Sequence, residues 1–176
     1  DRADIQTFQQ TFTGLMAGDG LSDRDLDTLS QYINTLRPYS SPLRLGGEDL
    51  TLKARIGGQI FKSAGCAVCH VPPLFTDRQK HDVGTGVPFH DHPDELGKIP
   101  EMMGNAFDTP SLRELWATDP FLHDGRASTL LEVLVKFNLS SDHGKTADLS
   151  KDDLLALEMF LLSLPLSDEE IQEIFD

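Results

Sequence analysis

The stretch Cys66-Ala67-Val68-Cys69-His70 decides the fold of this chain. Its pattern, Cys-x-x-Cys-His, is the attachment signature of c-type haem. Two cysteines three residues apart lie within one helical turn, so both sulfur atoms can reach the two vinyl groups of one porphyrin. The histidine that follows is then placed to bind the iron as its proximal ligand. The sequence therefore predicts one covalently attached haem c, held by Cys66, Cys69 and His70.

Two other interpretations of this pentapeptide are weaker. A structural zinc site needs about four nitrogen or sulfur ligands, and the 176 residues contain no cysteine beyond Cys66 and Cys69. A thioredoxin-like redox pair needs a strand-helix context, which the flanking sequence does not supply. Because haem attachment uses both cysteines, we expect no disulfide.

The composition restricts the partners of this chain. Its formal net charge is −14, which argues against nucleic acid and anionic membrane surfaces. The charge suits a basic redox partner protein, although it can also serve solubility alone. No apolar run approaches the length of a membrane span. Haem c is attached outside the cytoplasm, so we expect a periplasmic or otherwise exported protein.

An internal repeat indicates how the chain is organised. Six residues recur identically 128 positions later: Leu21, Ser22, Asp25, Leu26, Leu29 and Leu36 return as Leu149, Ser150, Asp153, Leu154, Leu157 and Leu164. Tyr32 and Ile33 are replaced conservatively, by Phe160 and Leu161. Each copy opens with a serine cap followed three residues later by an aspartate, and each stops at a proline. Both copies therefore predict a capped amphipathic helix.

Such a helix resembles the last helix of a cytochrome c domain. We therefore expect residues 1–45 to hold the C-terminal helices of a preceding cytochrome c-like domain plus a linker, with residues 39–42 in the linker. Residues 46–176 are expected to form the haem domain. Chance similarity between two amphipathic helices is the alternative.

The rest of the chain predicts helices joined by irregular segments. Apolar residues at helical spacing indicate helices near residues 5–15, 52–60 and 128–136, and Ser167 is placed to cap a final short helix. Residues 81–100 are rich in Gly, Pro and Asp and predict an extended loop. No run shows sustained strand alternation. The predicted fold class is all-α, a cytochrome c-like haem domain with long irregular loops.

Three further motifs carry a family resemblance. The haem motif is followed by Pro-Pro-Leu-Phe-Thr-Asp at 72–77 and His-Asp-Val-Gly-Thr-Gly at 81–86. Next come Phe-Asp-Thr-Pro-Ser-Leu-Arg at 107–113 and Pro-Phe-Leu-His-Asp-Gly-Arg at 120–126, and finally Asp-His-Gly at 142–144. In this order they resemble the C-terminal half of the di-haem cytochrome c peroxidase/MauG family, from about residue 57 to residue 164.

The resemblance implies a c-type haem electron-transfer domain of a peroxidase-type oxidoreductase. In that family each of two domains carries one haem c. The N-terminal haem meets peroxide, and the six-coordinate C-terminal haem relays electrons to or from it. A companion haem domain or subunit is therefore the expected partner. A stand-alone electron-transfer cytochrome c, or a haem-bearing subunit of a larger assembly, is the alternative.

The sixth iron ligand is where this chain departs from the family pattern. In the peroxidases a Met lies 14 residues after the His of the His-Asp-Gly motif, and here that position is Phe137. We favour His143 as the replacement, because many MauG-like sequences carry an Asp-His-Gly segment there. Met102 and Met103 are the alternative ligands.

The remaining candidates surround the haem. The resemblance maps its motif histidine onto His123, which is expected near the haem edge or as a loop-fixing residue. Arg113 and Arg126 are candidates to pair with the haem propionates. Trp116 is expected in the core or between redox centres. The family also holds a calcium ion between its domains through carbonyls that map to Thr118 and Pro120, and its third protein ligand belongs to the other domain. We expect a carbonyl of Pro72 or Pro73 to fix the second ring nitrogen of His70.

Overall fold

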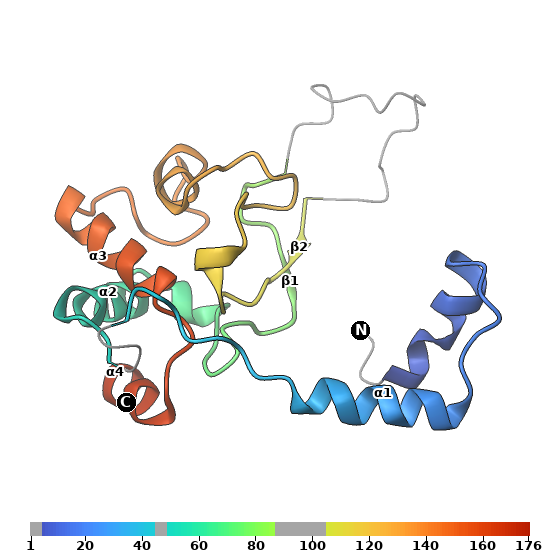
Figure 1. Ribbon diagram of the computed structural model, residues 1–176. Coiled ribbons are helices and arrows are strands. Elements are labelled where there is room, and N and C mark those ends of the chain that lie inside the picture. Colours follow the sequence, from blue (N-terminus) through green and yellow to red (C-terminus); the bar gives the residue numbers. More distant parts are fainter. Residues whose placement is uncertain (1–4, 45–48, 87–104) are drawn as a thin grey trace. The chain divides into compact units, whose positions relative to one another are not determined.

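The computed structural model describes residues 5–44, 49–86 and 105–176 (Figure 1). The helices and strands are η1 (Ile5–Phe8), η2 (Thr11–Leu15), α1 (Asp23–Thr35), α2 (Leu52–Ser63), η3 (Cys66–Val68), β1 (Lys80–His81), β2 (Phe107–Asp108), η4 (Leu115–Ala117), η5 (Glu132–Lys136), α3 (Lys151–Leu162) and α4 (Asp168–Phe175). The predicted all-α class is confirmed, with long irregular segments between the helices. The antiparallel pairing of β1 with β2 was not predicted, because a two-residue strand is too short to show alternation.

The chain divides into two compact units, residues 1–38 and 39–176. The first unit contains η1, η2 and α1. The Gln9 side chain holds it together, accepting from the Leu21 backbone N–H at 3.0 Å and donating to the Leu21 carbonyl. Leu26 is the one fully buried apolar residue among those described in this unit.

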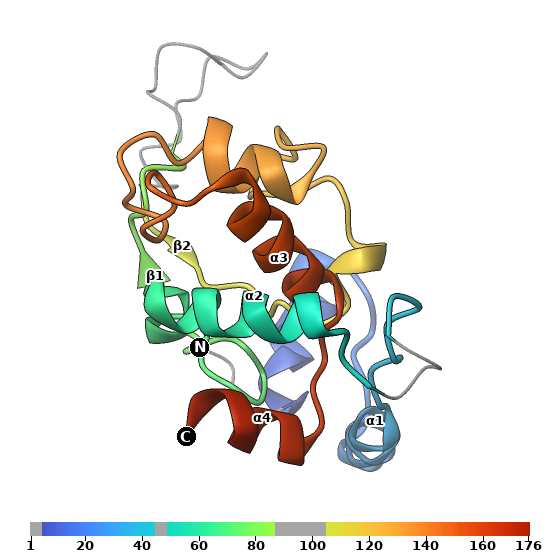
Figure 2. The ribbon, with the colours of Figure 1, turned by 90° about the vertical axis from the view of Figure 1, so that its left-hand side faces the viewer.

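The second unit is built on α2, which packs against both α3 and α4 (Figure 2). Glycine makes the approach to α3 possible, since a Cβ added at Gly57 would lie 1.9 Å from the Ala156 carbonyl oxygen. The predicted helix is confirmed, but Leu52 and Ile56 are exposed. Its buried face instead carries Ala54, Gly57, Gly58 and Phe61.

The predicted helix caps are present. Ser22 accepts from the Asp25 N–H at the start of α1. Ser150 and Asp153 form a reciprocal capping box at α3, and Ser167 and Glu170 form another at α4. The local signals for these helices are therefore satisfied as the sequence indicates.

Residues 39–42, expected as a linker, are anchored to the second unit. The buried Ser41 hydroxyl donates to the Leu162 carbonyl at 2.6 Å. Arg44 donates to both carboxylate oxygens of Glu170 at 2.6 Å and to the Pro165 carbonyl at 2.7 Å. A buried bidentate pair of this kind positions groups strongly. The segment after Pro38 thus belongs structurally to the C-terminal helices.

None of the helices in the described ranges is long and apolar enough to cross a membrane.

Candidate haem site

The Cys66–His70 segment forms a tight turn directly after α2. Gly65 ends the helix with a φ of +83°, in the left-handed region that glycine adopts readily. The short helix η3 follows, and the His70 N–H donates to the Cys66 carbonyl at 3.0 Å. This turn brings the two cysteines and His70 into one compact segment.

Both cysteines are free thiols and each is partly exposed. Burial raises the pKa of the Cys66 thiol to about 11, and burial followed by the charge of Asp77 raises the pKa of Cys69. The two sulfur atoms are thus available in the protonated form, with no disulfide between them.

His70 is buried and held by the core. Its Nδ1 lies 3.1 Å from the carbonyl oxygen of Phe75, so the prediction of Pro72 or Pro73 as the acceptor is wrong. Phe75 has a φ of +54°, an uncommon conformation for a phenylalanine. Its fully buried ring packs edge-on against Phe61, with centroids 6.0 Å apart. This packing fixes the carbonyl that orients His70, so Nε2 is the ring nitrogen that could bind a metal.

His143 faces His70 from the loop before α3. The two ring centroids are 6.2 Å apart, with an angle of 41° between the ring planes. Burial, and then the charge of His70, lowers the pKa of His143 to about 4, and burial also lowers the pKa of His70. Both rings are therefore neutral imidazoles near neutral pH, the form that binds metals.

The His143 loop also contacts the cysteine turn directly. The Lys145 N–H donates to the Ala64 carbonyl at 2.9 Å. A Cβ added at Gly144 would lie 3.3 Å from the Cys66 sulfur. The structure thus brings together Cys66, His70 and His143, three of the residues predicted from sequence.

Arg113 and Arg126, which the sequence predicts to bind the haem propionates, each have a buried N–H donor. Within the described ranges, the buried side-chain nitrogens without a hydrogen-bond partner are Arg113 Nε, Trp116 Nε1 and Arg126 Nη2. Arg126 uses its Nε to bind Asp124 at 2.6 Å. Unsatisfied buried donors are rare in folded proteins, so each of these N–H groups is a candidate to bind a ligand. Carboxylates are the acceptors that suit arginine N–H groups best.

Phe137, at the position of the family's Met ligand, ends η5. Its ring lies below two cations, 4.9 Å from Lys136 Nζ and 5.8 Å from the Arg126 guanidinium carbon. This is cation–π packing, and a phenyl ring offers no ligand atom for iron.

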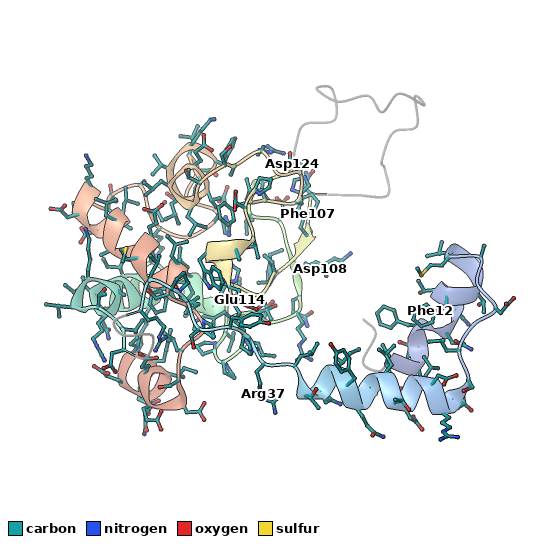
Figure 3. The ribbon with its side chains drawn as sticks, in the orientation of Figure 1. Phe12, Arg37, Phe107, Asp108, Glu114 and Asp124 are labelled. Carbon is teal, nitrogen blue, oxygen red and sulfur yellow. The ribbon has the colours of Figure 1, made fainter. Side chains whose placement is uncertain are left out.

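The other predicted residues lie elsewhere. His123 is exposed and stacks on Phe107 of β2, with centroids 3.7 Å apart. Figure 3 shows Phe107 near Asp124, the residue that follows His123. Thr118 and Pro120 are exposed in the loop after η4. Met102 and Met103 lie outside the described residues.

One cluster near the cysteine turn was not predicted. Ligand atoms of Cys69, Asp77 and His81 all lie within 4.8 Å of one another. Asp77 accepts from the Gln79 N–H and pairs with His81 at 2.7 Å, and these two contacts lower the pKa of Asp77 to about 2. The pair lies beside a cysteine that the motif assigns to haem attachment. No sequence motif joined these three residues, because only the fold brings them together.

Sequence reasoning also missed the residues that support the two histidines. Phe75 orients His70, Asn138 binds the backbone of His143, and the Thr146 hydroxyl accepts from the Asn138 side chain. The sequence signal for Asn138 and Thr146 was weak, namely two polar residues flanking the Asp-His-Gly segment.

Comparison with known proteins extends this picture, although no family model matches the chain. It is 30% identical over 178 residues to hydrazine synthase subunit gamma of Kuenenia stuttgartiensis, covering 83% of this chain and 50% of that protein. It is 31% identical over 173 residues to cytochrome-c peroxidase IdrP2 of Denitromonas iodatirespirans, covering 77% and 47%. It is 30% identical over 176 residues to the methylamine utilization protein MauG of Methylophilus methylotrophus, covering 86% and 51%. The chain thus spans about half the length of the curated relatives it matches.

Solved structures agree with the sequence relatives. A structure of Kuenenia stuttgartiensis hydrazine synthase superimposes with a TM-score of 0.68 at 29% identity, covering 90% of this chain and 61% of that one. A MauG-like protein associated with microbial copper homeostasis matches with a TM-score of 0.56 at 21% identity, covering 93% of this chain and 64% of that one. The second match is a likeness of fold alone.

Proposed function

Because this chain belongs to the di-haem cytochrome c peroxidase/MauG family, we propose that its second unit holds one haem c and relays electrons to or from a second haem. Cys66 and Cys69 form the thioether links, and His70 and His143 bind the iron. Haem c supplies reversible one-electron chemistry to such a site. The protein's own contribution is to attach, orient and enclose this group.

The spacing of His70 and His143 carries this proposal. A metal–imidazole nitrogen bond is about 2 Å long and the ring centroid lies about 1 Å beyond the nitrogen, so two imidazoles on opposite sides of one metal have centroids about 6 Å apart. The observed separation is 6.2 Å. Two neutral imidazoles at this separation suit a closed, six-coordinate iron.

Arg113, Trp116 and Arg126 are proposed to bind the propionates. Each has a buried N–H group without a partner among the described residues, and carboxylates are the acceptors that arginine binds best. Two propionates would make the net charge more negative than −14, so arginines beside them would offset that added charge locally.

An iron with all six coordination positions filled favours electron relay, because peroxide has no free position at which to bind. Phe137 removes the family's Met ligand, and His143 replaces it with a second nitrogen ligand. A His/His pair generally gives a lower potential than His/Met. His70 and His143 thereby hold the site in a coordination state suited to passing electrons.

The companion haem is proposed to lie in a domain to which the first unit belongs. The sequence of α1 resembles that of α3, the helix before α4, and each of the two helices begins with a serine cap.

We also propose an exported location, a basic redox partner, and a calcium ion bound by Thr118 and Pro120 together with the companion domain.

The proposal is tested by following the Soret band of the purified holoprotein. Ferrous protein should bind CO slowly, and ferric protein should not change on mixing with peroxide. His143→Ala should make both reactions fast, while the matched control His123→Ala should leave the site closed. Fast reaction of the unaltered protein with peroxide would contradict the relay function.

A further inference from the structure

We propose that Asn138 is a positioning residue for the sixth iron ligand. Its buried carboxamide holds the backbone of His143 so that the imidazole faces His70. This inference rests on the proposed function, in which His143 binds the iron. It adds a residue that lies outside the haem motif and the other motifs quoted from the sequence.

Asn138 binds both sides of the His143 residue. Its Oδ1 accepts from the His143 N–H at 2.9 Å, and its Nδ2 lies 3.2 Å from the His143 carbonyl oxygen. The N–H and the C=O flank the Cα atom from which the imidazole projects. Fixing both groups on one rigid amide therefore fixes the direction of the Cα–Cβ bond.

The same amide binds the next residues of the loop. Nδ2 donates to the Gly144 carbonyl at 2.8 Å and to the Thr146 hydroxyl oxygen at 2.8 Å. Asn138 is 3% exposed, so water does not replace these bonds easily. A backbone N–H faces the amide oxygen of Asn138, and three acceptor oxygens surround its amide nitrogen. These partners distinguish the oxygen from the nitrogen and so define the orientation of the amide.

Thr146 connects this arrangement to the helix that precedes it. Its hydroxyl accepts from Asn138 and donates to the Leu134 carbonyl of η5 at 2.6 Å. Thr146 is buried as well. The polar network thus runs from η5 through two buried side chains to the backbone of His143.

The loop needs such support because it is not in a relaxed conformation. Ser141 has a φ of +59°, which is unfavourable for a serine. Its N–H donates to the Asn138 carbonyl at 3.2 Å. The side chain and the main chain of Asn138 therefore both hold the turn that presents His143. Without the carboxamide, the turn can relax and the imidazole can leave the position opposite His70.

The expected effect is a larger population of open iron. Losing two or more hydrogen bonds around one buried peptide corresponds to a roughly ten- to hundredfold rise in that population. The rate of CO binding to ferrous protein should rise by the same factor, since CO binds only when His143 has left.

The experiment uses the full holoprotein and three variants. Asn138→Asp keeps the shape but removes the N–H donors. Thr146→Val keeps the volume but removes the hydroxyl. Leu139→Ala is the control, because Leu139 is a neighbour in the same loop and is 87% exposed. Each is measured for CO-binding rate and for high-spin signal in the ferric electron paramagnetic resonance spectrum.

We expect faster CO binding and a high-spin component in Asn138→Asp, smaller changes in Thr146→Val, and none in Leu139→Ala. Added imidazole should restore the low-spin spectrum of Asn138→Asp by taking the place of His143, and a far-ultraviolet circular dichroism spectrum equal to that of the unaltered protein excludes general loss of structure. A folded Asn138→Asp holoprotein with the unaltered CO rate overturns the inference. If that variant does not fold, Thr146→Val decides, and an unaltered rate there overturns it.

His143→Ala, measured in parallel, separates this inference from the proposed function. If His143→Ala leaves the spectrum and the CO rate unchanged, the ligand assignment fails and the inference fails with it. If His143→Ala opens the iron but Asn138→Asp does not, the ligand assignment stands and only the positioning role is wrong.

Discussion

The helices α1 and α3 share a sequence pattern but differ in what they bury. Tyr32, Ile33 and Leu36, at the end of the α1 copy, are all exposed. The matching residues of the α3 copy, Phe160, Leu161 and Leu164, are all buried in the core of the second unit. The serine caps are formed in both. Cap and helix are therefore local properties of the repeat, whereas burial depends on what the helix packs against.

The partner of α3 is visible in the structure. α2 crosses α3 at Gly57, and the Phe61 and Phe160 rings meet with centroids 5.2 Å apart. Within residues 5–38 only η1 and η2 accompany α1, and neither contributes a buried residue. The comparison indicates that, among the described residues, α3 packs against α2 whereas α1 has no equivalent helix within its own unit.

The largest expected effect on the free energy of unfolding comes from removing the buried Phe160 ring of α3. Phe160→Ala should lower the free energy of unfolding of the holoprotein by about 3–5 kcal/mol, from lost burial and the cavity left behind. Tyr32→Ala, at the same place in the exposed copy, should change it by less than about 0.5 kcal/mol. Urea unfolding followed at the Soret band measures both. Equal losses from the two variants would show that the copies are buried alike.

A glycine pair gives the next largest contrast. Gly57→Ala places a methyl group against the Ala156 carbonyl and should destabilise the second unit by about 1–3 kcal/mol. Gly14→Ala meets nothing within 4 Å in the first unit. It should be neutral to slightly stabilising, by up to about 1 kcal/mol. Thermal unfolding distinguishes them, and a tolerated Gly57→Ala would refute the close helix contact.

The two serine caps should differ more modestly. Ser150→Ala should cost the second unit about 1 kcal/mol, because it breaks a capping box. Ser22→Ala removes the equivalent cap of α1. It should leave the unfolding midpoint measured at the Soret band unchanged, because α1 lies in the first unit. A matching shift from Ser22→Ala would mean that the two units unfold together.

Deleting residues 1–38 should have the smallest effect of all. The boundary lies before the segment anchored by Ser41 and Arg44, so the second unit keeps all these contacts. The shortened holoprotein should keep the Soret spectrum and the unfolding midpoint of the full chain. Loss of bound haem on deletion would contradict the independence of the second unit.

Structure that depends on neighbouring residues was predicted correctly from the sequence, whereas contacts between distant segments were mispredicted or not predicted. The serine caps and the all-α class follow from residues close together in the chain, and the structure confirms both. The acceptor for His70 was misassigned to Pro72 or Pro73, because the left-handed turn at Phe75 is set by core packing. The buried face of α2 was likewise not predicted, since three of its four buried residues, Ala54, Gly57 and Gly58, are small.

In the candidate site, too, short motifs predicted some residues, and only the fold reveals the others. His143 was proposed from a short motif, and the structure brings it opposite His70. Asn138 carries no motif, and its importance appears only when its four contacts are seen together. Trp116 gave no signal beyond being the single tryptophan, yet its indole N–H is buried without a partner among the described residues.

The whole account depends on a haem joined covalently to this chain, and one mass spectrum tests that directly. Protein matured in a host that attaches c-type haem is denatured, freed of non-covalent ligands and weighed. We predict the 19.5 kDa polypeptide mass plus the mass of one haem, with the Cys66→Ser/Cys69→Ser double variant returning the bare polypeptide mass. A bare polypeptide mass for the unaltered chain would contradict the account.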